Sequence, residues 1–218
     1  RRHRPHDCRR RVDRARRPVR LGQDHAVAHD CGIPDADGRA HLASMGAVVD
    51  DPRDRTIERI VLRPYRSSTT YANLSRAGEA VFHVTDDVGM IARAAVGKLD
   101  PLPQLRRAAG VDGWIVADAC RWYALRAKRI DDSGARACVE ADVVGHGSIR
   151  DFCGLNRGMY AVVEGAIFAS RIGLLSAGEV MAALAPLAVL VEKTGGPRER
   201  DAWAFLESYV LDKAEEGK

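Results

Sequence analysis

Residues 63–74 constrain the fold of this chain more than any other segment. They read Arg-Pro-Tyr-Arg-Ser-Ser-Thr-Thr-Tyr-Ala-Asn-Leu, with four hydroxyl residues in a row at 67–70. The β-branched run at 56–62 predicts a strand before them, and residues 71–77 predict a short helix that ends at Gly78. A strand that leads through hydroxyl residues into a helix start gathers free backbone N–H groups and the positive end of the helix dipole.

This arrangement has two interpretations. A phosphate group suits it, because the hydroxyls donate hydrogen bonds and Arg66 adds positive charge beside the helix N-terminus. The simpler interpretation is that Ser68 or Thr69 only caps the helix. The residues of this segment taken alone leave both open.

The first half of the chain has the pattern of a β structure with short helices. Strands are predicted at 39–49, 56–63 and 79–85, and Thr85-Asp-Asp87 can cap a helix over about 88–96. A loop is expected from there to about 115.

Two longer runs, 121–130 and 135–144, flank Asp131-Asp-Ser-Gly134 and predict a hairpin. Tyr123, Leu125 and Ala127 fall on one face of the first run, and Arg126 and Lys128 share the other face with Trp122. One dry and one wet face are typical of a barrel wall. Sequential antiparallel strands of this kind favour a small barrel and an α+β fold.

The period of the apolar residues changes to that of helices after residue 150. Ser176 and Glu179 form a capping-box pattern at the start of one helix, and Gly195-Gly196 ends it before Pro197 opens the next. We therefore expect a barrel domain over residues 23–149 and a C-terminal helical subdomain over residues 150–218.

Positive charge is concentrated at one end of the chain. Residues 1–20 hold ten arginines against Asp7 and Asp13, whereas the remainder is slightly acidic. We expect residues 1–22 to form a disordered Arg-rich tail. The alternative is that its bias toward Arg, His and Pro comes from a misplaced gene start or an upstream frameshift. Without aromatic interleaving or zinc-ligand spacing, the tail does not predict specific nucleic-acid binding. Residues 23–32, where the first barrel strand should lie, make a poor strand.

The cysteines and the hydropathy pattern indicate a cytoplasmic protein. The five cysteines are odd in number and widely spaced, which argues against a disulfide framework or a zinc site. No stretch approaches the ~20 apolar residues of a membrane helix. The histidines His41, His83 and His146 are candidate acid–base groups, but no motif pairs them with a nucleophile or carboxylate. Strand alternation predicts that His83 faces solvent or a pocket mouth. We expect a structural role for all three histidines, because nothing positions them for catalysis.

Five segments, in order, resemble domain-of-unknown-function family 447, whose members look like FMN-binding split-barrel proteins related to flavin reductases. The likeness spans roughly residues 32–205, in the segments Asp37–Gly46, Arg66–Leu74, Gly78–Asp87, Gly154–Glu164 and Val191–Arg200. It implies an FMN-binding split β-barrel with a C-terminal helical part.

The resemblance also implies a cofactor site and a partner. In split-barrel flavin proteins the hydroxyl segment and helix start hold the FMN phosphate, and a strand edge runs along the flavin ring. Carried over, the cofactor-binding residues are Ser44, Met45, Arg66, Ser67, Ser68, Thr69, Thr70 and Asn73. A homodimer with FMN in a groove at the subunit interface is the implied assembly.

The function implied is that of an FMN-dependent oxidoreductase of the flavin-reductase type, with an unknown small-molecule electron donor or acceptor. The alternative is a flavin- or phospholigand-binding module without turnover. The chain has no G-x-G-x-x-G fingerprint for a nicotinamide dinucleotide.

Overall fold

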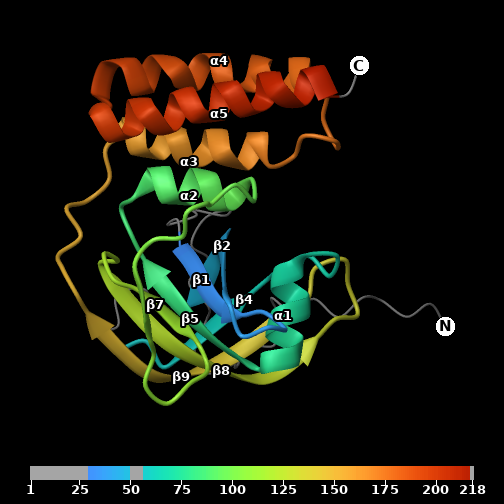
Figure 1. Cartoon of the computed structure of the whole chain (residues 1–218), viewed down its shortest axis with the longest axis vertical. Coiled ribbons are helices and arrows are strands. Elements are labelled where there is room, and N and C mark those ends of the chain that lie inside the picture. Colours follow the sequence, from blue (N-terminus) through green and yellow to red (C-terminus); the bar gives the residue numbers. More distant parts are fainter. Residues whose placement is uncertain (1–28, 50–55, 217–218) are drawn as a thin grey trace, which may run out of the picture.

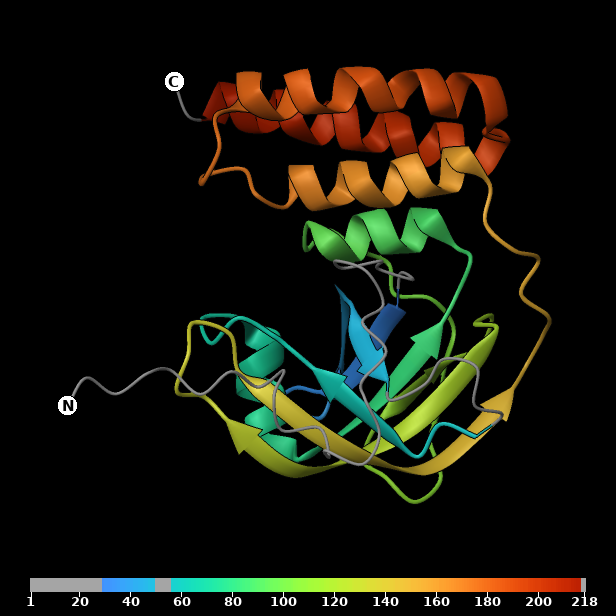
Figure 2. The ribbon, with the colours of Figure 1, turned by 180° about the vertical axis from the view of Figure 1, so that it is seen from behind.

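The computed structural model describes residues 29–49 and 56–216. The predicted tail at 1–22 and residues 23–28 lie outside the described residues. Figure 1 shows a curled β-sheet at one end of the molecule and a stack of helices at the other, and Figure 2 shows the same two layers from behind.

The sheet has seven strands in the order β2-β1-β5-β8-β9-β4-β3, and every pairing is antiparallel. The strands are β1 (His29–Pro34), β2 (Ala40–Met45), β3 (Ala47–Val49), β4 (Arg59–Leu62), β5 (Glu79–Val84), β8 (Arg121–Asp131) and β9 (Cys138–Ser148). Only Gly46 separates β2 from β3, yet these strands are at opposite ends of the order. The sheet must therefore curl until its ends meet, which is the geometry of an open or split barrel.

The predicted strand over 39–49 is therefore two strands. Gly46, which is exposed and has no atom within 4 Å of where a Cβ would lie, is the point at which the chain crosses from one end of the sheet to the other. The apolar pattern continues through this glycine, so the break could not be seen in the alternation of side chains. The alternation of β8 is confirmed in part: Tyr123 and Leu125 are buried inside the barrel and Arg126 is exposed, whereas Ala124 on the other face is buried in a second apolar cluster with Ile115.

Three further strands differ from expectation. A strand, β1, forms between β2 and β5 although its sequence predicts one poorly, because neighbours on both sides satisfy its backbone. The predicted loop before residue 115 contains a small hairpin of β6 (Leu105–Arg107) and β7 (Trp114–Val116). Strands of three residues are too short to show a period.

Four helices stack above the barrel (Figure 1): α2 (Val88–Ala95), α3 (Arg157–Ala169), α4 (Ala177–Thr194) and α5 (Pro197–Glu216). Their shared core includes Val88 and Ile91 of α2, Val162 of α3, Leu184 of α4 and Leu206 of α5. Because α2 belongs to the chain segment of the barrel but to the core of the helices, the two layers share an element. The boundary at residue 150 stays a prediction.

The predicted helix ends are confirmed. Ser176 and Glu179 form a capping box, Gly195 caps the end of α4, and Asp87 caps α2 by accepting from the N–H of Met90. Gly78 ends the short helix α1 (Thr69–Ala77) with a left-handed φ of 65°, which glycine adopts without strain.

The prediction that His83 faces solvent is wrong. Its side chain is fully buried, and Nε2 accepts a hydrogen bond from the N–H of Val116 at 3.1 Å. The β6–β7 hairpin covers this face of β5, and the covering segment is the one that the sequence had suggested to be a loop. A structural role for His83 follows.

Among residues 29–49 and 56–216, no helix is long and apolar enough to cross a membrane, and no cluster of metal-ligand side chains occurs. Cys120 is buried and Cys153 exposed, and both are free thiols, whereas Cys138 is disulfide-bonded. The sequence did not lead us to expect a disulfide.

Candidate functional site

The connection from β4 into α1 forms one wall of the site. Ser68 is the N-cap of α1, and its hydroxyl accepts from the N–H of Tyr71 at 3.1 Å and donates to the carbonyl of Tyr65 at 2.6 Å. The N–H of Ser68 also donates to Tyr65, at 3.0 Å. Both donors of Ser68 are thus used within the turn, so its role is to shape the helix start.

The same turn is tied to the β8–β9 hairpin. The N–H of Arg66 donates to the carbonyl of Ala135 at 3.3 Å, and the Tyr71 hydroxyl donates to Asp132 Oδ2 at 2.8 Å. The guanidinium of Arg136 donates to the Tyr65 hydroxyl at 2.7 Å and lies 4.1 Å from the centre of its ring. The hydroxyl segment at 67–70 is therefore held in place by the β8–β9 hairpin, which is distant from it in sequence.

β2 approaches α1 through His41. His41 Nε2 lies 3.3 Å from Thr70 Oγ1, and which of the two donates depends on the histidine tautomer. Burial lowers the pKa of His41, and the nearby Asp35 opposes this only in part. The imidazole is accordingly biased toward its neutral form, with Thr70 almost fully buried beside it.

One turn further along α1, a polar group has no partner. Asn73 is 7% exposed, and its Nδ2 finds no hydrogen-bond acceptor among the described residues. Thr70 and Asn73 are three residues apart on the helix, so their side chains share a face. A buried amide donor without a partner costs free energy, so Nδ2 of Asn73 is a donor that a bound ligand could satisfy. Arg63, which follows β4 in the same connection, also has a buried Nε without a partner there.

The helix start supplies further donors. The N–H groups of Thr69 and Thr70 are in the first turn and so have no acceptor inside the helix. Ser67 and Thr69 are exposed, as is Arg66. Together with the helix dipole, these groups form an environment suited to an anion.

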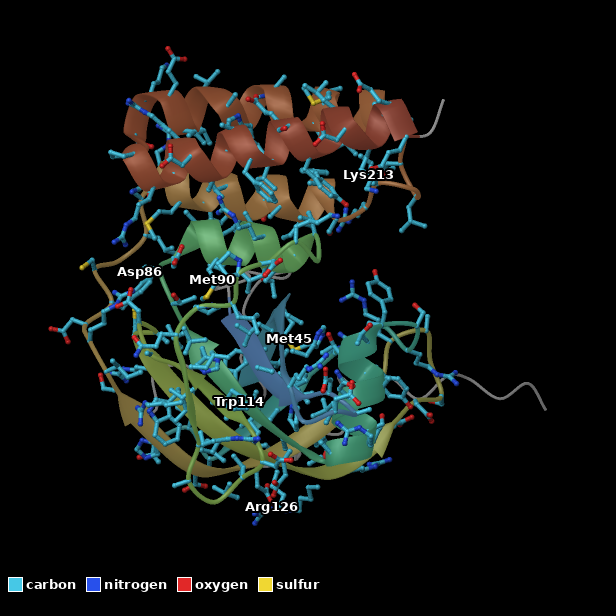
Figure 3. All side chains as sticks on the ribbon, in the orientation of Figure 1. Met45, Asp86, Met90, Trp114, Arg126 and Lys213 are labelled. Carbon is cyan, nitrogen blue, oxygen red and sulfur yellow. The ribbon has the colours of Figure 1, made fainter. Side chains whose placement is uncertain are left out.

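The two remaining predicted residues lie on β2. Ser44 donates its hydroxyl hydrogen to the carbonyl of Ile91 in α2 at 2.9 Å, whereas Met45 packs against the barrel core. Figure 3 shows Met45 between the strand β1 and helix α1. β2 is at the end of the strand order, so every second N–H along its outer edge has no partner in the sheet.

The structure thus brings together Thr69, Thr70 and Asn73 on α1, and places Ser44 and Met45 further along the strand that carries His41. His41 and Ser44 are three residues apart, about 10 Å along a strand. The donor set at the start of α1 suits an anion such as a phosphate group. Reasoning from the sequence named His41 only as a candidate acid–base group, because only the fold brings β2 to α1.

Family comparison agrees with this architecture over most of the chain. The model "Protein of unknown function (DUF447) N-terminal domain" matches residues 34–150, and the model "Protein of unknown function (DUF447)" for the C-terminal domain matches residues 156–208. This chain belongs to the DUF447 family. No curated protein matches the sequence of this DUF447 member.

Solved structures share the fold. A crystal structure of an FMN-bound DUF447 protein from Methanosarcina mazei matches with a TM-score of 0.70 at 18% identity, over 84% of this chain and 93% of that one. An FMN-binding protein from Thermus thermophilus gives 0.49 at 11% identity, over 59% and 75%. The styrene monooxygenase flavin reductase from Pseudomonas putida S12 gives 0.46 at 12%, over 56% and 81%. Only the first of these likenesses is close enough to carry an argument, and it establishes the fold.

Proposed function

We propose that this DUF447 protein binds FMN, with the phosphate at the N-terminus of α1 and the flavin ring along the outer edge of β2. The observation that carries the proposal is the buried amide of Asn73, which has no acceptor in the described residues and lies one turn from Thr70 at a helix start. The fold shared with an FMN-bound family member supports the choice of ligand.

In this proposal each residue has a distinct task. Thr69 and Thr70 donate backbone N–H groups, and Ser67, Thr70 and Asn73 donate from their side chains. Arg66 supplies positive charge from the exposed side. Ser68 holds the turn in place, and the outer edge of β2 at Ser44 and Met45 donates one backbone N–H to the ring.

The proposed activity is that of an oxidoreductase of the flavin-reductase type, acting as a homodimer with the flavin at the subunit interface. Bound FMN would supply the redox chemistry, and the protein would hold and orient it. Turnover of NADH or NADPH by flavin-loaded protein would distinguish this activity from a binding module without turnover.

The first test is an absorption spectrum of purified protein after incubation with FMN and gel filtration. We expect flavin absorbance to co-elute with the protein in near-stoichiometric amount. A colourless protein that takes up no FMN would contradict the proposal.

The site itself is tested by Thr70→Val combined with Asn73→Leu, which remove two donors with little change of shape. A hydrogen bond to a charged group contributes about 1.5–3 kcal/mol, so FMN affinity should fall by about two orders of magnitude or more. Ser75→Ala, at an exposed position near the far end of α1, is the matched control. Unchanged affinity in the folded double variant would contradict this placement of the phosphate.

A further inference from the structure

The outward face of α4 is apolar although it is exposed. Residues 180–191 contain twelve consecutive side chains without a charged or hydrogen-bonding group, yet only Val180, Leu184 and Val191 of α4 are buried. α4 lies in the layer of helices farthest from the barrel (Figure 1). A helix that is hydrophobic all round is normally covered on every side.

The exposed stripe is centred on Pro186. At 3.6 residues per turn, Ala182, Ala183, Val189 and Leu190 fall within roughly 60° of Pro186, and the buried residues lie on the opposite side. Pro186 and Ala182 are exposed and Val189 is 43% exposed. Ala183 and Leu190 are half-buried, with Leu190 in contact with the helical core on one side. Charged residues occur in this stripe only at its two ends, as Glu179 and Lys193.

The stripe is complementary to itself when reversed about Pro186. An antiparallel second copy places Lys193 opposite Glu179, so opposite charges meet at both ends. It also places Leu190 opposite Ala182 and Val189 opposite Ala183, so that each large side chain faces a small one. Oε2 of Glu179 accepts from Ser176 at 2.8 Å, and no described residue bonds to Oε1. The centre of the stripe carries no acidic side chain. It therefore does not suit the Arg-rich residues 1–20 of this chain as its partner.

We propose that α4 is an interface with a second copy of this chain, paired antiparallel across a two-fold axis at Pro186. This contact is separate from the pairing proposed around the flavin, because α1 and β2 lie toward the barrel and α4 is on the far side of the helical layer (Figure 1). The two contacts do not depend on each other.

The test is the mass of the full chain in solution, measured by sedimentation equilibrium over a range of concentrations. Val189→Glu should halve the largest mass that wild-type protein reaches, whether or not a second contact exists. Leu102→Glu, at a loop position that is 44% exposed, is the matched control and should leave the mass unchanged.

A second variant tests the orientation. Adding Ala183→Lys to Val189→Glu should restore the wild-type mass, because the two positions face each other between copies but are six residues apart within one helix, too far to pair there. A wild-type mass of one chain, or a mass unaffected by Val189→Glu, would overturn the interface. Halving without restoration, in a variant with wild-type circular dichroism, would overturn the antiparallel register.

Discussion

Arg150, which follows β9, joins three separate parts of the chain. Its two terminal nitrogens donate to both carboxylate oxygens of Asp86, and its Nε donates to Asp118. Asp86 lies between β5 and α2, so this ion pair fixes the corner from which α2 leaves the barrel. Figure 3 labels Asp86 at that corner.

Loss of this ion pair should change stability in a pH-dependent way. The hydrogen bonds from Arg150 hold the pKa of Asp86 below its usual value, so at acidic pH the unfolded chain binds more protons than the folded one. The contribution of the ion pair to stability is therefore lost as pH falls through about 4 and below. Arg150→Met should cost about 1.5–3 kcal/mol near neutral pH and should weaken this acid sensitivity. Urea unfolding between pH 3 and 7 measures both, with exposed Arg157→Met as the control. An equal cost at every pH would contradict the assignment to Asp86.

His41 should contribute a second pH dependence. Because burial lowers its pKa in the folded state, the unfolded chain takes up the proton first, and stability should decline as pH falls below about 6.5. His41→Gln should make the melting temperature less dependent on pH between pH 5 and 7.5. Ser75→Ala, at an exposed position of α1, changes no titratable group and should leave the slope as it is. A slope unchanged by His41→Gln would assign the effect to another group.

The helices pack closely at glycine positions. A Cβ on Gly165 of α3 would lie 2.8 Å from the ring of Trp203 in α5 and 3.2 Å from Leu184 in α4. Glycine is therefore used where three helices meet, at the cost of its lower helix propensity.

The pair Gly165→Ala and Gly178→Ala tests this packing with the same chemical change. Gly165→Ala should destabilise by about 1–3 kcal/mol through overpacking. At Gly178, in the first turn of α4, nothing lies within 4 Å of the added Cβ, so alanine should be neutral or stabilise by up to ~1 kcal/mol. Guanidinium denaturation compares them. Equal effects would show that helix propensity, and not the contact, determines the outcome.

The barrel and the helices should unfold together. α2 lies between them, with Ile91 in the helical core and Met90 in a small cluster with Leu42 of β2. Because both layers bury surface of one element, we expect a single calorimetric transition whose van't Hoff and calorimetric enthalpies agree. Two resolved transitions would instead favour independent domains divided at residue 150. A chain ending at residue 150 is expected to aggregate, since the apolar face of α2 would be exposed.

Local chemistry determined much of this protein. The caps at Ser68, Asp87 and Ser176, the helix stop at Gly78 and the alternation along β8 depend on residues close in sequence, so the sequence alone predicts them. The hydroxyl segment and helix start of the candidate site belong to the same class.

Only the tertiary structure decided which strands are neighbours and what surrounds α1. Closure of the sheet at Gly46, burial of His83 under the β6–β7 hairpin, and the approach of His41 to Thr70 all join residues far apart in the chain. The apolar run of α4 predicts a buried helix, but the fold leaves one side of that helix uncovered. Hydrophobic burial is non-directional, so a sequence predicts that a surface will be covered, whereas packing determines what covers it.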